Sequence, residues 1–219
     1  MATVRFQRAR SAESKLQRSQ SLIAAARSLA LEKGVASVTL TAVAERARVH
    51  HSAVRRYFAS YKDVLLQLAA EGWDRWAGAV SETLRGRQVT PAELADVLAS
   101  TLAADSLFCD LLANVPLHLE HDVDVERVIE FKKSSGAAIR ALTRTVAAAV
   151  PSLGPAGALD IVTAANALAA TLWQVTHPGA ALRAALDSDP ALALVGPGDF
   201  EKTLTRLLHA TCAGLTQEP

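Results

Sequence analysis

Apolar residues recur every three or four positions along most of the chain, which is the spacing of helices that bury one face. No stretch of the sequence shows the strict alternation of apolar and polar residues that is typical of a half-buried strand. The chain is therefore predicted to be all-α. Helices are expected at residues 14–34, 40–47, 51–57, 61–84, 91–104, 106–115, 123–150, 156–176 and 199–216.

Two of these predicted helices are short and almost adjacent. Thr39 is a good N-cap for the helix at 40–47, and only three residues separate that helix from the next one at 51–57. Two short helices joined by so tight a turn are typical of a helix-turn-helix. The small apolar residues expected between them are Ala44, Val49 and Val54.

Glycines, prolines and capping residues divide the rest of the chain. Gly34 supplies a left-handed position at the end of the first helix. Thr90 and Pro91 open one helix, Pro116 ends another, and "PSLGPAG" (151–157) is predicted to be a loop. Acidic residues in the first turn of the helix at 123–150 match its dipole, and they are Asp122, Asp124 and Glu126.

Charge is distributed unevenly, although the net charge is only +1. Residues 1–62 hold 12 Lys or Arg and 3 Glu, whereas residues 63–219 hold 11 basic and 19 acidic residues. A basic module joined to an acidic remainder indicates a polyanionic partner for the first part and a different role for the second. A basic segment that only keeps the protein soluble is the alternative.

Half of the 219 residues are hydrophobic, so the chain can bury a sizeable core as one large domain or two small ones. Its most apolar stretch, 161–175, is too short and too polar for a membrane span, and residues 1–20 lack the apolar core of a secretory signal. The protein is expected to be cytoplasmic, without a membrane partner. Cys109 and Cys212 are expected to be buried, reduced thiols.

The helix predicted at 51–57 carries polar residues on one side. Arginine can fork onto a guanine edge or a phosphate, and histidine, serine and threonine can form hydrogen bonds with base edges. The pattern therefore indicates contact with DNA, and a solvated basic helix is the alternative. With the apolar residues Ala53, Val54 and Phe58 facing inward, the outer face holds His51, Ser52, Arg55 and Arg56, beside Thr41.

Four segments between residues 16 and 68 follow the pattern of a known protein family. They are "LIAAARSLALEKG", "VTLTAVAERARV", "HHSAVRRYF" and "ASYKDVLL", and in order and spacing they resemble the DNA-binding domain of the TetR/AcrR family of transcriptional regulators. Arg48 stands where that family usually has a glycine in the turn, His50 where a serine commonly caps the recognition helix, and Arg55 where a tyrosine is usual. A left-handed Arg48 would cost about 1 kcal/mol, which its charge can offset at a phosphate.

The resemblance implies a domain organisation. After a flexible basic arm at 1–13, it implies an N-terminal three-helix helix-turn-helix DNA-binding domain at 14–62. A larger helical ligand-binding and dimerisation domain then follows at 63–219. The expected DNA-binding residues are Thr39, Thr41, Arg48, His50, His51, Ser52, Arg55, Arg56, Tyr57 and Lys62.

The resemblance also implies a function. Members of the TetR/AcrR family dimerise through their last two long helices, here 156–176 and 199–216, so that two recognition helices about 34 Å apart read a near-palindromic operator. Leu172 and Leu208 are expected in this interface, although the helix at 156–176 would look the same if it were buried within one protomer. A ligand-responsive repressor is the expected function, with double-stranded DNA, a small-molecule effector and a second copy of the chain as partners.

The effector is expected to be a mostly apolar small molecule that binds among the central helices, as the family's pocket would. For each polar residue in the expected lining, an ordinary buried hydrogen bond is the alternative. The expected lining residues are Phe108, Leu111, Leu112, Asn114, Val115, His118, Phe131, Asn166, Trp173 and His177, with Ile139 and Gln174 beside them.

The sequence contains no Gly-rich phosphate loop and none of the common catalytic or metal-binding motifs, so neither an enzyme nor a cofactor is expected. His118 and His121 are three residues apart and precede acidic residues, a spacing that can bind a metal. The start of a capped acidic helix fits these residues equally well. A helical metal- or small-molecule-binding protein without a DNA role is the alternative function, but it leaves the charge asymmetry and the turn unexplained.

Overall fold

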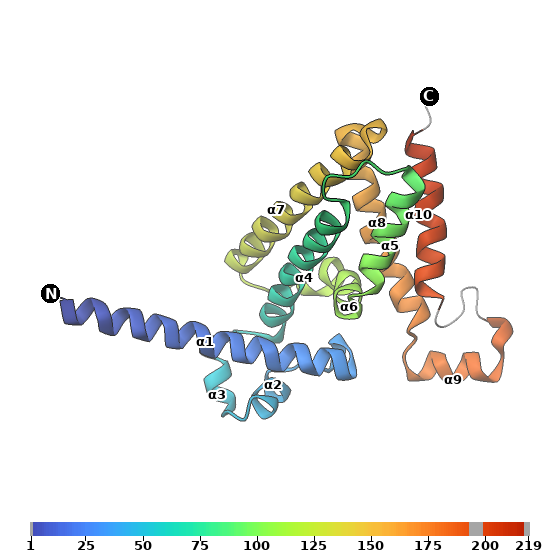
Figure 1. Ribbon diagram of the computed structural model, residues 1–219. Coiled ribbons are helices and arrows are strands. Elements are labelled where there is room, and N and C mark those ends of the chain that lie inside the picture. Colours follow the sequence, from blue (N-terminus) through green and yellow to red (C-terminus); the bar gives the residue numbers. More distant parts are fainter. Residues whose placement is uncertain (1, 193–198, 217–219) are drawn as a thin grey trace. The chain divides into compact units, whose positions relative to one another are not determined.

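The computed structural model describes residues 2–192 and 199–216, and every regular element in these ranges is helical (Figure 1). The predicted all-α class is confirmed for this part of the chain. The chain divides into two compact units, Met1–Leu68 and Ala69–Pro219. The division falls six residues after the boundary expected from sequence, because the first two turns of the helix that begins at Tyr61 belong to the first unit.

The first unit contains α1 (Ala2–Lys33), the short 3₁₀ helix η1 (Val35–Ser37), α2 (Leu40–Arg46), α3 (His51–Val54) and the start of α4 (Tyr61–Leu84). The second unit contains the rest of α4, α5 (Pro91–Ala103), α6 (Ser106–Asn114), the π-helical η2 (Val115–Leu119), α7 (Val125–Ala149), the 3₁₀ helix η3 (Pro151–Leu153), α8 (Gly154–Thr176), α9 (Ala180–Ser188), η4 (Pro190–Leu192) and α10 (Phe200–Thr216).

The first helix begins much earlier than the apolar pattern predicts. The segment 1–13 was expected to be a flexible arm, but α1 starts at Ala2. Residues 2–33 contain no glycine or proline and are rich in Ala, Arg, Gln, Leu and Ser, so nothing in the segment breaks a helix. The pattern missed this part because regular apolar spacing in the sequence starts only at Leu22.

The core of the first unit forms where α1 packs against α2 and η1 and where α2 packs against α3. Leu22 and Ala26 of α1 are 1% and 0% exposed, and Val43 of α2 is fully buried. Val54 and Phe58 are also buried, as the sequence predicted for the inner side of the second short helix. Burial of each large apolar side chain contributes about 1.5–3 kcal/mol, so these residues fix α2 on α1 and α3 on α2.

Helix α8 lies at the centre of the second unit. It packs against α5, α6, α7 and α10, and α10 also packs along α5 (Figure 1). Its buried residues repeat every three or four positions, and half of them are glycine or alanine, which allow neighbouring helices to approach closely. The stretch Pro151–Thr176 is long and apolar enough to cross a membrane by length and composition alone, a property that core helices of soluble proteins share.

Three aromatic rings fill the interior between α4 and α6. The ring centroid of Trp73 lies 5.6 Å from that of Trp76 and 5.4 Å from that of Phe108. Trp76 donates a hydrogen bond from Nε1 to Oγ1 of Thr101 at 3.0 Å, which satisfies its only polar group. A methyl group at Gly72 would lie 2.2 Å from Cδ2 of Phe108, so only glycine allows this ring to lie so close to α4.

Helix boundaries in the second unit differ from the predicted ones at two junctions. Pro116 was expected to end a helix, but the chain continues through the π-helical turn η2, because a proline near the start of a new turn removes no needed donor. Helix α8 starts at Gly154, inside the predicted loop, with Pro155 in its first turn for the same reason.

The start of α7 also differs. It begins at Val125, so Asp122 and Asp124 precede it and only Glu126 lies in its first turn. Asp122 has a positive φ of 54°, which is incompatible with an ongoing α-helix.

Both cysteines are buried and unpaired, as predicted. Burial raises the pKa of the Cys109 thiol to about 12 and that of Cys212 to about 11. Neither thiol is therefore suited to act as a nucleophile or a metal ligand in the folded protein.

Candidate nucleic-acid interface and effector region

The start of α2 is fixed by Thr39. Its Oγ1 accepts a hydrogen bond from the backbone N–H of Ala42 at 3.1 Å, so the predicted N-cap is confirmed. At the other end of α2, the N–H of Val49 donates to the carbonyl of Ala44 at 2.9 Å. This bond folds the chain back toward α2 immediately before α3 begins.

The turn requires a left-handed residue, and Arg48 occupies that position. Its φ is 55°, the left-handed conformation for which a glycine is usual in the TetR/AcrR family, and its N–H donates to the carbonyl of Glu45 at 3.1 Å. An L-residue in this conformation costs about 1 kcal/mol relative to glycine. Because arginine rather than glycine occupies this strained position, the turn carries an exposed guanidinium group.

The start of α3 is capped by His50. Its Nδ1 accepts a hydrogen bond from the N–H of Ser52 at 3.3 Å and lies 2.9 Å from that residue's Oγ. The helix itself is shorter than the predicted 51–57, because the N–H of Tyr57 bonds to the carbonyl of Val54 at 2.9 Å, three residues back. Such a bond tightens the last turn and ends the α-helical pattern.

The predicted DNA-binding residues form one mostly exposed set on α2, the turn, α3 and the start of α4, which we call the recognition surface. All ten lie within the first unit. Thr39, Thr41, Arg48, His50, Ser52, Arg55 and Arg56 are exposed, whereas His51, Tyr57 and Lys62 are half-buried.

The arginines of this region fall into two groups. Arg46 forms an ion pair with Glu32 of α1 and donates a hydrogen bond to Ser28 at 2.7 Å, so it holds α2 on α1. The Arg46 guanidinium in turn lowers the pKa of the Glu32 carboxyl. Within the described residues, Arg48, Arg55 and Arg56 have no carboxylate partner, so their charges are free to meet an external anion.

Asp63 positions the end of the recognition surface, a role that the sequence analysis missed. It is 6% exposed, and its Oδ2 accepts hydrogen bonds from the N–H groups of Ala59 and Ser60 at 2.7 and 3.0 Å. Ser60 returns the interaction by accepting from the N–H of Asp63 at 3.3 Å. The pattern S-x-x-D in "SYKD" was the available signal, because it is a form of the capping box.

The predicted effector residues lie on α6, η2, α7 and α8 in the second unit. Trp173 and His177 stack with ring centroids 3.7 Å apart, and Phe200 packs edge-on against Trp173 at 5.2 Å. Oδ1 of Asn166 is buried without a hydrogen-bond partner. Of the ten residues, Phe108, Leu111, Leu112, Val115 and Phe131 are buried, Asn114, Asn166 and Trp173 are half-buried, and His118 and His177 are exposed.

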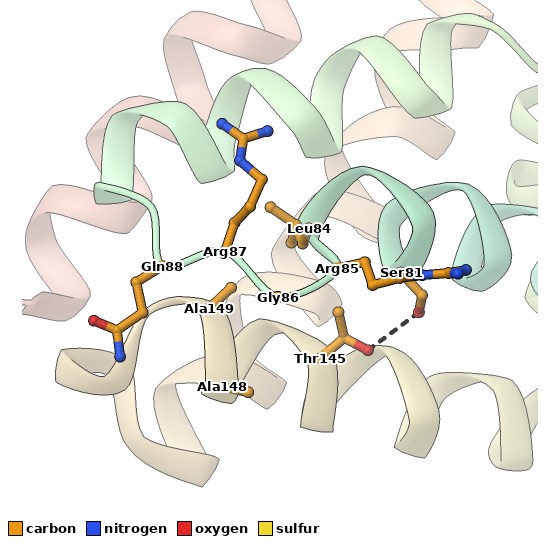
Figure 2. A pocket seen from close by; sticks show the side chains of 9 residues that line it. All are labelled: Ser81, Leu84, Arg85, Gly86, Arg87, Gln88, Thr145, Ala148 and Ala149. Carbon is orange, nitrogen blue, oxygen red and sulfur yellow. Dashed lines mark hydrogen bonds between the residues drawn. The ribbon is translucent and has the colours of Figure 1, made fainter.

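A groove of about 470 Å³ lies elsewhere in the second unit, between the connection from α4 to α5 and the end of α7 (Figure 2). Hydroxyl groups of Ser81 and Thr145 form a 3.1 Å hydrogen bond at its edge. The groove shares no residue with the predicted effector lining. Its lining residues are Ser81, Leu84, Arg85, Gly86, Arg87, Gln88, Thr145, Ala148 and Ala149.

The pair His118 and His121 was singled out for its metal-like spacing. His118 is exposed, and Nε2 of His121 lies 3.3 Å from the backbone carbonyl oxygen of Pro116. Among the described residues, no group of three or more His, Cys, Asp or Glu side chains is placed to hold a metal ion.

Two family profiles match the sequence. One, described as bacterial regulatory proteins of the tetR family, matches residues 22–68, which contain the recognition surface. The other, described as a tetracyclin repressor-like C-terminal domain, matches residues 70–219, well over half of the chain. No curated protein matches the chain.

Solved structures of similar fold cover almost the whole chain. A protein of unknown function from Rhodococcus sp. RHA1 is 21% identical, with a TM-score of 0.57 over 91% of this chain and 95% of that one. The fatty acid degradation regulator FadR from Bacillus halodurans is 16% identical, with a TM-score of 0.54 over 91% and 97%. FadR from Bacillus subtilis, in complex with stearoyl-CoA, is 13% identical, with a TM-score of 0.52 over 90% and 97%. At these identities the similarity is one of fold.

The strain at Arg48 gives a prediction. Arg48→Gly should raise the free energy of unfolding by about 1 kcal/mol, because glycine adopts a positive φ without steric cost, while weakening any interaction with a polyanion through the lost charge. Arg48→Gln is the matched control, since it removes the charge but keeps the strain and should leave stability near that of the unsubstituted protein. Chemical denaturation measures both, and a glycine variant less stable than the glutamine variant would contradict the assignment of strain.

Proposed function

The chain belongs to the tetR family of bacterial regulatory proteins, and we propose that its recognition surface binds the major groove of an operator in double-stranded DNA. Regulators of this family are generally soluble DNA-binding proteins rather than enzymes, so the proposed location is the cytoplasm. The observation that carries the proposal is the set of three exposed arginines without carboxylate partners around a short, capped helix.

The chemistry of the surface supports separate roles for its residues. Arg55 and Arg56 follow α3 and can fork onto guanine edges or phosphates, whereas Ser52 and His50 at its N-terminal end offer hydrogen bonds to base edges. Arg48 in the turn is a phosphate contact in this proposal, as are the hydroxyl of Thr39 and the ammonium group of Lys62. The base contacts then determine which DNA sequence is bound, and the phosphate contacts determine how the protein is oriented on the duplex.

We further propose that the protein acts as a homodimer through the outer faces of α8 and α10. Along α8, the exposed positions at Leu159, Thr163, Ala167 and Thr171 recur every four residues. Leu159 is 46% exposed despite its size. The other three positions carry small residues, which suit the close approach of a second copy of the helix. A two-fold dimer supplies the two recognition helices that a near-palindromic operator needs.

The residues first expected at this interface belong to the core of the protomer instead. Leu172 is 8% exposed and Leu208 is 0% exposed. Charged residues at these positions would destabilise each protomer and would not report on dimerisation. The sequence could not separate the two faces of α8, because apolar residues occur on both of them.

For the effector, we propose a mostly apolar small molecule that binds among α6, α7 and α8, where the predicted lining residues lie. Phe108 and the two tryptophans already fill the neighbouring interior, so binding would require these rings to move. Helix α4 carries both tryptophans and continues into the first unit. A ligand that prefers the shifted arrangement would lower operator affinity by moving the equilibrium between two conformations, which gives repression that the effector relieves.

The DNA-binding proposal is tested by Arg55→Ala combined with Arg56→Ala. Operator affinity, measured on duplexes selected from random sequence, should fall about thirtyfold or more, since each lost contact is worth about 1–3 kcal/mol. The dependence of affinity on salt should weaken as well. Arg140→Ala with Arg144→Ala, which removes two exposed charges from α7, is the control and should retain binding. Equal affinity in the two double variants would refute the proposal.

The dimer proposal is tested by Leu159→Glu combined with Ala167→Glu. Burying unpaired carboxylates between two protomers should cost about 3 kcal/mol or more, which raises the dimer dissociation constant about a hundredfold. Sedimentation velocity should then show folded monomers with poor operator binding. Leu182→Glu on α9, where the leucine is 52% exposed, is the control. A dimer that persists in the α8 variant would place the interface elsewhere.

The effector proposal is tested first with stearoyl-CoA, the ligand of the Bacillus subtilis FadR structure, and with free coenzyme A as the control. Binding of the acyl chain should change the fluorescence of Trp73 and Trp76 and reduce operator affinity at saturation. Saturation of the fluorescence change with unaltered operator affinity would contradict the conformational mechanism. A response to free coenzyme A equal to that of the thioester would contradict an apolar effector.

A further inference from the structure

Helix α1 extends well beyond the helix-turn-helix to which it belongs. From Glu13 to Ser21 its side chains are exposed, apart from a half-buried Ser19, and from Glu13 onward the first buried residue is Leu22. In Figure 1 this N-terminal part of α1 extends past α2 and α3. The segment from Glu13 to Ser21 therefore adds nothing to the buried core of its unit.

The register of α1 relates this exposed part to the core. Lys15 stands seven residues before Leu22, and Arg18 stands seven residues before Ala25, so each basic residue shares a helix face with a buried one. Leu22 and Ala25 are 1% and 8% exposed, on the buried face of the helix that packs against α2 and η1. Beyond the core, that same face of α1 changes from apolar to basic. In the sequence, Arg8 continues the seven-residue series.

The charge of this part favours a polyanion. Residues 1–21 contain five Lys or Arg and one acidic residue, Glu13. In the described part of the chain, neither Lys15 nor Arg18 is paired with a carboxylate. A helix that lies on a lipid surface needs an apolar stripe opposite its basic one. After Met1, the large apolar residues of the same segment are only Val4, Phe6 and Leu16, and no two of them are three, four or seven positions apart. The composition therefore suits nucleic acid better than a membrane.

We propose that the basic face of α1, centred on Lys15 and Arg18, is a second DNA contact that binds the phosphate backbone flanking the site read by α3. This inference rests on the proposed function. At 1.5 Å per residue, Lys15 lies about 10 Å along the helix from Leu22, so the contact falls outside the core of the helix-turn-helix. Phosphate contacts of this kind add affinity and salt dependence but no discrimination between sequences.

The experiment compares the unsubstituted protein with Lys15→Gln/Arg18→Gln. Affinity for the selected operator and for a scrambled duplex is measured by fluorescence anisotropy over a series of salt concentrations. The logarithmic salt slope should decrease by about 0.9 for each lost phosphate contact, or about two per protomer. Both duplexes should be weakened by the same factor, so that the specificity ratio is unchanged.

Two controls isolate the position and the charge. Lys133→Gln/Arg144→Gln removes one lysine and one arginine from exposed sites on α7 and should leave the slope unchanged. Lys15→Arg/Arg18→Lys keeps both charges on α1 and should retain the slope of the unsubstituted protein. Circular dichroism checks that every variant keeps its helical content.

The possible outcomes separate this inference from the function on which it rests. An unchanged slope in the Lys15→Gln/Arg18→Gln variant overturns the second contact while leaving the recognition surface intact. A lower specificity ratio overturns the assignment to phosphates. If the protein binds phosphatidylglycerol vesicles, the substitutions abolish that binding and the salt slope is unchanged, the face is assigned to lipid instead. If the unsubstituted protein binds no duplex, the proposed function itself fails.

Discussion

The tight turn between α2 and α3 is the constraint on which the recognition surface depends. The hydrogen bond from Val49 to Ala44 folds the chain back so closely that the preceding residue must adopt a positive φ. Arg48 accepts that conformation, and α3 follows with its last residue, Val54, buried in the core. Because the inner side is fixed in this way, the arginines that follow are left on the outside. Local backbone geometry thus orients the charges that make DNA binding the best-supported function.

The basic character of the first unit serves two purposes that the composition alone does not distinguish. Arg46 is held by Glu32 and Ser28, so its charge contributes to packing between helices. Arg55 and Arg56 have no such partner among the described residues and remain available for an external anion. The face of α1 that carries Lys15 and Arg18 belongs to the same group. A count of basic residues therefore overstates the positive charge that is available to bind an anionic ligand. The ion pairs show which of these charges are already neutralised within the protein.

In the second unit, close packing limits what an effector can do. The contact between Gly72 and Phe108 holds the aromatic rings close against α4, whereas the groove near Arg87 lies at the far end of α4. The effector mechanism that we propose, a shift between two conformations, fits rings that are packed this closely. Helix α8 adds a second restriction, because its inner face of small and apolar residues is buried in the core and only its outer face can meet a second protomer.

The sequence by itself determined the helical class, the caps at Thr39 and Thr90 and the inward direction of Val54. These features depend on periodicity and on hydrogen bonds between residues a few positions apart, so a local pattern reveals them. Only the tertiary structure decided that Leu172 faces the protomer core, that Arg46 is paired, and that Gly72 makes room for a ring on another helix. Those features depend on contacts between residues distant in sequence, which no local pattern encodes. The length of α1 is a different case, because an exposed helix without a buried stripe carries helix-forming residues but none of the periodicity by which helices are recognised.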